Sequence, residues 1–149
     1  MAQTFDVIVI GAGIMGCSAA FELAQRGLKV AVLEKGGIGA GSTGKSSAII
    51  RQHYSNELTA RMALYSLRVF QNFEERVGED CGFTQTGFAA IVAAKDQAGL
   101  EANVALQRRV GIQTELISPA ALHELMPGLD TPIWSAPLTN PKPATPTPT

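Results

Sequence analysis

Three glycines and one acid give this chain its clearest chemical signal. Gly11, Gly13 and Gly16 form a G-x-G-x-x-G motif, and Glu34 follows the first of them by 23 positions. In a dinucleotide site the first glycine allows a sharp turn, the second leaves room for a pyrophosphate, and the third lets a helix lie close to a strand. A carboxylate at this distance accepts both hydroxyls of an adenosine ribose. The pattern therefore predicts a site for a dinucleotide and argues against NADP, whose 2′-phosphate the carboxylate would repel.

Two apolar runs and a helix must position these residues. Residues 6–10 and 28–33 have the composition of buried parallel strands, and the stretch between them is suited to a helix that begins at the glycine turn. Such a helix directs free N–H groups and the positive end of its dipole at the phosphates. The alternative is a βαβ unit with a glycine-rich turn and no ligand. The predicted cofactor contacts in this unit are Gly11, Ala12, Gly13, Ile14, Met15, Gly16, Glu34 and Lys35.

The residues after Glu34 favour a flavin over a nicotinamide cofactor. An NAD domain of the usual kind moves into another strand–helix repeat soon after the acid. Here residues 36–47 are rich in glycine and serine and lead directly into residues 48–54. Backbone amides and hydroxyl groups of such a segment can follow the ribityl chain and second phosphate of FAD. The alternative is a flexible Gly/Ser linker.

At these residues the chain resembles the D-amino-acid-oxidase-like FAD oxidoreductases, and within them the sarcosine oxidase and dimethylglycine dehydrogenase branch. Gly41-Ser42 and Ile49-Ile50-Arg51 are similar to the flavin-contacting segment of that branch, and the resemblance covers roughly positions 5–130. It implies FAD as cofactor and oxidation of a C–N bond in a small secondary or N-methylated amino acid. A covalent histidyl link to FAD is not expected, because no histidine follows the Gly-Ser pair. Further implied FAD contacts are Gly41, Ser42, Thr43 and Ser47.

Arg51 is the candidate catalytic residue. The resemblance places it close to the isoalloxazine ring, where a guanidinium can stabilise negative charge on the reduced flavin. The alternative is a structural ion pair. His53 and Tyr54 are candidates for lining the substrate side, although a packed or hydrogen-bonded role is more common for a lone histidine after an apolar pair.

Composition excludes several other classes. The chain has 149 residues and a net charge of −1, so it offers no basic field for nucleic acid. Cys17 and Cys81 form no metal-like cluster and fit a reducing compartment. The first apolar run has no preceding Lys or Arg and is interrupted by glycines, so neither a signal peptide nor a membrane span is expected. We expect a cytoplasmic protein with a small amino-acid-like substrate, while association with other subunits stays open.

The remaining residues predict an α+β region and a tail. Residues 55–126 begin with a helix whose apolar stripe is expected to be core. The stripe consists of Leu58, Met62, Tyr65, Val69, Phe73 and Val77. We then expect a strand at 87–94, a helix from Asp96 to a stop at Gly111, a strand at 112–117, and a short helix that ends before Pro127. Residues 127–149 hold seven of the eight prolines. Because proline cannot donate to a β-ladder, this tail is expected to be disordered or in a polyproline II conformation.

The predicted fold class is α/β: a Rossmann-like FAD-binding βαβ unit with its flavin loop (1–54), followed by the start of an α+β substrate-binding region (55–126) and the Pro/Thr-rich tail (127–149). In the family that the chain resembles, later residues return to complete the nucleotide domain. This chain does not return, so we expect the N-terminal part of such an enzyme, a truncated or frame-shifted product that is inactive alone. The alternative for residues 127–149 is a Pro/Thr-rich linker or interaction tail. Two alternatives stay open: a nicotinamide-binding dehydrogenase fragment and a non-catalytic nucleotide-binding module.

Overall fold

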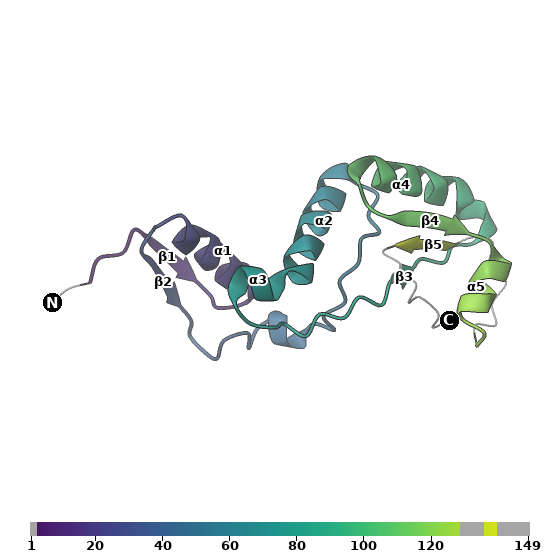
Figure 1. Ribbon diagram of the computed structural model, residues 1–149. Helices are drawn as coiled ribbons and strands as arrows, with labels where there is room; N and C mark the ends of the chain where they lie inside the picture. The colour runs from purple at the N-terminus through teal and green to yellow at the C-terminus, as the bar shows by residue number, and fades with distance from the viewer. Residues whose placement is uncertain (1–2, 129–135, 140–149) are drawn as a thin grey trace, which may run out of the picture. The chain divides into compact units, whose positions relative to one another are not determined.

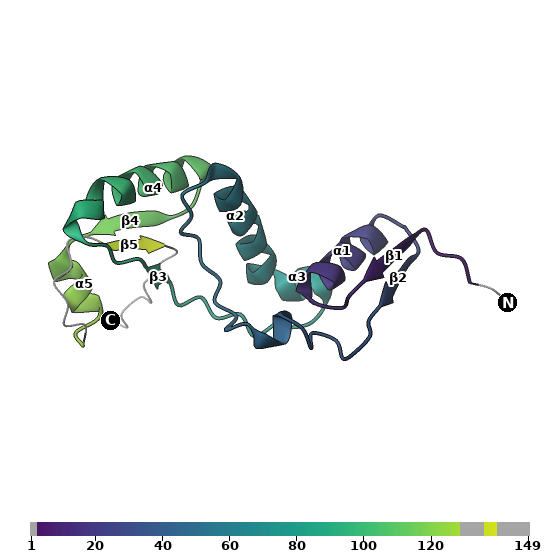
Figure 2. The same ribbon diagram turned by 180° about the vertical axis from the view of Figure 1, so that it is seen from behind.

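The computed structural model describes residues 3–128 and 136–139 (Figures 1 and 2). The chain divides into two compact units, Met1–Ile49 and Ile50–Thr149. This division falls slightly before the boundary expected after Tyr54, so residues 50–54 belong to the second unit. Most of the predicted tail, 127–149, lies outside the described residues.

The first unit is a βαβ unit. β1 (Val7–Ile10) and β2 (Val30–Leu33) pair in parallel, with Val7 opposite Val30. α1 (Ile14–Gln25) connects them and packs on both strands. Parallel strands need a crossover of this kind, and valine and isoleucine favour the extended backbone of the strands. The Rossmann-like start of the predicted fold is confirmed.

The segment after β2 folds back on the glycine turn. The N–H of Gly39 donates to the carbonyl of Ala12 at 2.9 Å. A short 3-10 turn, η1 (Thr43–Lys45), follows. A Cβ added at Gly44 would lie 2.7 Å from the carbonyl oxygen of Gly39, so the chain passes itself closely here. These contacts hold the segment against the turn, which is not the behaviour of a flexible linker.

The second unit combines helices with a three-stranded antiparallel sheet. The strand order is β3-β5-β4, and α4 runs alongside β4 in both ribbon views. α2 packs on α4. The elements are α2 (Glu57–Gln71), α3 (Phe73–Val77), β3 (Phe88–Ala89), η2 (Ala94–Asp96), α4 (Gln97–Val110), β4 (Thr114–Ile117), α5 (Pro119–Leu125) and β5 (Ala136–Thr139).

The predicted signals at the ends of the later helices are confirmed. α4 begins directly after Asp96, whose side chain makes no capping hydrogen bond, and ends at Gly111, which has a left-handed φ of 97° that suits glycine. α5 begins after Ser118, whose side chain accepts a hydrogen bond from the N–H of Ala121 at 3.2 Å. It ends at Leu125, before Pro127. Local residue types therefore determine where these helices start and stop.

Two predictions about strands are wrong in part. The strand expected at 87–94 is a ladder only at Phe88–Ala89, with an isolated bridge at Val92, and the chain enters η2 at Ala94. The tail expected to lack β-pairing contributes β5, which pairs with both other strands. The β3 partners of β5 are Leu138 and Thr139, so Pro137 has a neighbouring strand on one side only, where Leu116 of β4 lies opposite. Proline, which has no N–H to donate, is tolerated at such an edge position.

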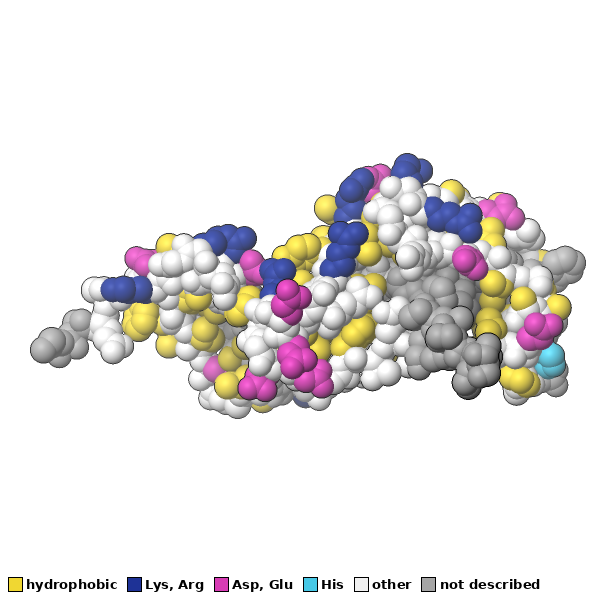
Figure 3. Space-filling view, viewed as in Figure 1, with side chains coloured by type: hydrophobic (Ala, Val, Ile, Leu, Met, Phe, Trp, Pro, Cys, Tyr) yellow, Lys and Arg dark blue, Asp and Glu magenta, His cyan; other side chains and the backbone are white. Residues whose placement is uncertain are grey.

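The apolar stripe on α2 was expected to be core, and this prediction is wrong for most of it. Leu58, Met62 and Tyr65 are 68%, 60% and 56% exposed. The buried face of α2 instead presents Ala60 and Leu67, and Figure 3 shows hydrophobic side chains at the surface over α2. The sequence spacing correctly marks an apolar face, but nothing among the described residues covers it. Val77, at the end of the same stripe, is also exposed.

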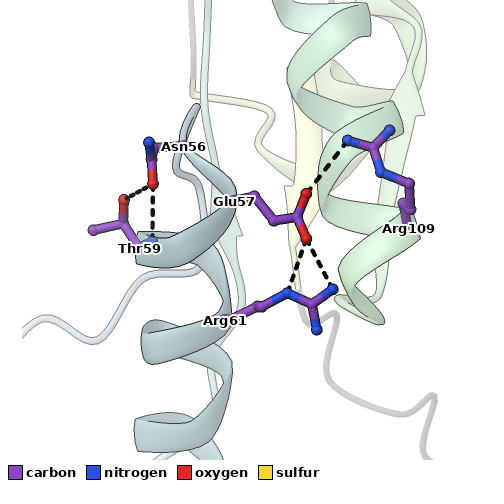
Figure 4. A network of polar contacts seen from close by, with 5 residues as sticks. All are labelled: Asn56, Glu57, Thr59, Arg61 and Arg109. Carbon is purple, nitrogen blue, oxygen red and sulfur yellow. Dashed lines mark hydrogen bonds and ion pairs between the residues drawn. The ribbon is translucent and has the colours of Figure 1, made fainter.

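Polar contacts fix the first turn of α2 (Figure 4). The Oδ1 atom of Asn56 accepts hydrogen bonds from the N–H and the hydroxyl of Thr59, at 3.2 and 3.1 Å. Glu57 accepts from Arg61 at 2.8 Å and lies 3.9 Å from a guanidinium nitrogen of Arg109 on α4. These ion pairs are exposed, so they contribute little to stability. Glu57 and Arg61 thus mark a solvated face of α2.

Candidate dinucleotide-binding site

The glycine turn, residues 11–16, directly follows β1 and has little room for side chains. Gly11 has a φ of 100°, a left-handed conformation, and its N–H donates to the carbonyl of Leu33 at 2.7 Å. A Cβ added at Gly16 would lie 1.9 Å from the carbonyl oxygen of Gly11. No side chain can occupy that position unless the backbone moves. Gly11 therefore permits the turn, and Gly16 permits the close approach of α1 to it, which are the geometric roles that the motif predicts.

Thr43 completes the first turn of α1 from a distant part of the chain. The N-cap residue Gly13 has no side chain to accept a hydrogen bond, and the Oγ1 atom of Thr43 instead accepts from the N–H of Ile14 at 2.9 Å. A Cβ added at Gly13 would lie 3.1 Å from this oxygen. The early N–H groups of a helix have no partner within it, so the amides of Met15 and Gly16 are left for an anionic ligand.

Glu34 holds the turn from the end of β2. Its Oε2 atom accepts from the N–H of Ala12 at 2.8 Å, and its Oε1 atom accepts from the N–H of Gly36 at 2.8 Å. These two hydrogen bonds hold the pKa of the Glu34 carboxyl below its ordinary value of 4.5. Each carboxylate oxygen can accept more than one hydrogen bond. Glu34 can therefore order the turn and still accept the hydroxyls of a ribose, as predicted.

The low pKa of Glu34 leads to a testable dependence on pH. Because its folded-state pKa lies below 4.5, the carboxylate stabilises the folded turn above pH 4.5, and this stabilisation is lost as the pH falls through the lower folded value. In an NMR titration the amide signals of Ala12 and Gly36 should move together, with a midpoint below 4.5. A midpoint at or above 4.5 would show that these hydrogen bonds do not favour the charged form.

The other predicted cofactor contacts lie along the exposed segment that follows Glu34. Ser42 is the N-cap of η1, and Lys35, Gly41 and Ser47 are exposed. The first unit thus brings together a bare glycine turn, free helix amides, a carboxylate and a row of hydroxyl groups. This donor and acceptor set fits the adenosine diphosphate half of FAD. Within the residues that the structure describes, no group of three His, Cys, Asp or Glu side chains could hold a metal ion.

Arg51 lies in the second unit, beside Tyr54. Its guanidinium carbon is 5.3 Å from the centre of the Tyr54 ring, within the range of a cation–π interaction. No carboxylate in the described part of the chain forms an ion pair with Arg51. The alternative role of Arg51, in a structural ion pair, therefore finds no carboxylate partner within residues 3–128.

Two buried glutamines hold the segment that follows Arg51, and the sequence interpretation missed both. The Nε2 atom of Gln52 donates to the carbonyl of Ala63 on α2 at 2.8 Å. The Nε2 atom of Gln107, on α4, lies 3.0 Å from the Nδ1 atom of His53 and donates to the carbonyl of Tyr54 at 3.3 Å. Residues 52–54 are thus tied to two helices of the second unit.

Burial of these two glutamines is costly. Gln52 and Gln107 are 1% and 0% exposed, and the Oε1 atom of each is buried without a hydrogen-bond partner. An unpaired buried acceptor costs about 1–3 kcal/mol. One signal was present in the sequence: Leu100, Val104 and Gln107 follow each other at helical spacing, so the glutamine occupies a position where a helix usually buries an apolar side chain.

His53 is half-buried in this segment. Its burial lowers its pKa below the ordinary value of 6.5, and the positive charge of Arg51 lowers the pKa further, whereas the hydrogen bond with Gln107 acts in the opposite direction. The neutral imidazole is therefore favoured. His53 therefore has a hydrogen-bonded role through Nδ1, and the prediction that it lines the substrate side stays a prediction.

Several known proteins are similar to this chain in sequence or in structure. L-proline dehydrogenase from P. horikoshii has a similar structure, with a TM-score of 0.84, 32% identity, and coverage of 94% of this chain and 37% of that one. Sarcosine oxidase subunit beta from Rhodobacter capsulatus is 28% identical over 86% of this chain and 32% of its own length. The mitochondrial pyruvate dehydrogenase phosphatase regulatory subunit of Mus musculus is 32% identical over 84% of this chain and 14% of its own.

These relatives are much longer proteins, since the chain spans between 14% and 37% of their lengths. The family described as DAO, FAD dependent oxidoreductase, matches residues 6–144, which include the glycine turn, Glu34 and Arg51. FAD is therefore the cofactor that the family match indicates. The chain belongs to the DAO family of FAD-dependent oxidoreductases.

Proposed function

We propose that this chain supplies the FAD-holding part of an oxidoreductase that oxidises a C–N bond of a small secondary or N-methylated amino acid. The observation that carries the proposal is the first unit, in which Glu34 and Thr43 hold the glycine turn and leave helix amides free for a phosphate. Proline and sarcosine, which appear in the names of two relatives, are both secondary amines, and this supports the substrate class.

The residues of the chain have separate roles in this proposal. The amides at the start of α1 bind the pyrophosphate, and Glu34 accepts the ribose hydroxyls. The chemistry that FAD supplies when bound is acceptance of a hydride from the substrate. Arg51 provides positive charge near the reacting groups, with Tyr54 orienting its guanidinium. The backbone and hydroxyl groups of residues 41–47 bind the rest of the cofactor.

We propose further that the chain has no substrate turnover by itself. The relatives that it matches are much longer, because the matched part of this chain covers only 37% and 14% of two of them. The two-stranded sheet of the first unit also exposes apolar side chains, with Ile10 86% and Leu33 54% exposed. Sheet faces of this kind are normally covered. A catalytic centre needs substrate positioning and exclusion of water, which these residues alone do not provide.

A hybrid protein tests the proposed function. In the hybrid, this chain replaces the matched 37% of L-proline dehydrogenase. Under anaerobic conditions, L-proline should bleach the visible absorbance of bound FAD in the hybrid, whereas the chain alone with excess FAD should show no substrate-dependent bleaching. Bleaching in the chain alone would contradict the proposal of inactivity. A correctly folded hybrid that binds no FAD would contradict the proposed role of the first unit.

A non-catalytic FAD-binding module is the second candidate. One observation favours it: a relative with 32% identity is named as a regulatory subunit of a phosphatase. The hybrid separates the two candidates, because a segment that binds FAD but supplies no catalytic group such as Arg51 would give a yellow protein whose flavin proline reduces much more slowly.

A further inference from the structure

Gln107 has a hydrogen-bonding arrangement that stability alone does not explain. It is fully buried on α4, at a position that continues the apolar positions of Leu100 and Val104, and one of its polar atoms has no partner. A leucine there would fit the same stripe without an unpaired buried oxygen. What the amide provides, and leucine would not, is two donated hydrogen bonds to residues 53 and 54.

The two contacts determine the orientation of the Gln107 amide. The carbonyl of Tyr54 can only accept a hydrogen bond, so the atom that faces it at 3.3 Å must be the amide nitrogen. With the opposite orientation, the Gln107 oxygen would face another oxygen. The same nitrogen lies 3.0 Å from the Nδ1 atom of His53. An amide nitrogen only donates, so Nδ1 must be the acceptor and must carry no hydrogen.

We propose that Gln107 is a positioning residue that fixes His53 as the neutral imidazole with its hydrogen on Nε2. His53 then presents one N–H donor next to Arg51 and adds no positive charge of its own. This inference rests on the oxidation proposed above. With His53 neutral, Arg51 is the single positive charge in residues 46–56, between η1 and α2. A ligand oxygen can then accept a hydrogen bond from the Nε2–H of His53. The lowered pKa of His53, which Arg51 and burial favour, is consistent with this state.

The protonation of the His53 nitrogens can be measured directly in the full chain. With ¹⁵N-labelled histidine, NMR distinguishes a protonated from a bare ring nitrogen. At a pH well above 6.5, the ordinary pKa of histidine, Nδ1 should be bare and Nε2 protonated. In Gln107→Glu the new carboxylate can only accept, so Nδ1 should become protonated. In Gln107→Leu neither nitrogen is fixed, and a mixture of the two tautomers is expected.

Gln113→Glu is the matched control, because Gln113 is exposed and follows the same helix. It should leave the His53 signals unchanged. A protonated Nδ1 in the unmodified chain, or a bare Nδ1 in a folded Gln107→Glu variant whose new carboxyl group is ionised, would overturn the inference. If the glutamate variant does not fold, the protonation of Nδ1 in the unmodified chain and the tautomer mixture in Gln107→Leu still test the inference. The measurement does not depend on FAD or turnover, so a failure of the proposed function leaves its result interpretable.

Discussion

Replacing Gly16 with alanine is expected to abolish FAD binding by the first unit. The new Cβ would lie 1.9 Å from the carbonyl oxygen of Gly11, and a backbone atom cannot be moved aside as a flexible side chain can. Either α1 moves away from the turn or the turn changes its shape, and in both cases the helix amides no longer point at the pyrophosphate. We expect the affinity for FAD to fall by about 100-fold or more in a calorimetric titration of the proline dehydrogenase hybrid.

Gly37→Ala is the control for this variant. It also adds one methyl group to the first unit, but its nearest neighbour would be the Cβ of Ala40 at 3.9 Å, an ordinary contact. Its affinity for FAD should stay within about twofold of the unmodified hybrid. If Gly16→Ala bound FAD as tightly as Gly37→Ala does, the close packing at Gly16 would not be what shapes the site.

The second large effect is expected for Arg51→Ala in the same hybrid. If the guanidinium stabilises negative charge on the reduced flavin, its loss should lower the flavin reduction potential and slow reduction by proline by about 10²-fold. FAD occupancy should stay nearly intact, because Arg51 is not part of the glycine turn. Stopped-flow reduction and a redox titration measure the two quantities. Arg51→Lys should restore part of the rate, since it keeps the charge but loses the planar group that stacks on Tyr54.

Arg61→Ala is the matched control for Arg51. Arg61 is also an arginine of the second unit, but it forms an exposed ion pair with Glu57 on α2. Its removal should change neither the potential nor the rate. A loss of FAD occupancy in Arg51→Ala, with normal reduction of the remaining holoprotein, would instead show that Arg51 is structural.

The first unit could be predicted from the sequence because its determinants are local. Glycine spacing, two apolar runs and an acid at a fixed distance specify a βαβ unit and its turn with few alternatives. The sequence did not reveal that Glu34 also binds the amides of Ala12 and Gly36, or that Thr43 caps α1. Both contacts depend on how the segment after β2 folds back, which no local pattern encodes.

The second unit shows where sequence patterns stop being informative. The spacing of Leu58, Met62 and Tyr65 identified an apolar face of α2 correctly, but periodicity cannot tell whether another part of the protein covers that face. The proline-rich composition around Pro137 argued against a strand, but pairing with β4 makes residues 136–139 a strand. The role of Gln107 arises from contacts with residues more than fifty positions away, which cannot be predicted from a single chain.

The central claim is that the first unit is built for FAD, and a comparison of cofactor affinities tests it most directly. The chain should be titrated by calorimetry with FAD, NAD⁺ and NADP⁺ under identical conditions. If residues 36–47 bind the flavin part of the cofactor as proposed, FAD should bind at least about tenfold more tightly than NAD⁺, and NADP⁺ should bind most weakly because the Glu34 carboxylate would repel its 2′-phosphate. Tighter binding of either nicotinamide cofactor than of FAD would contradict the account.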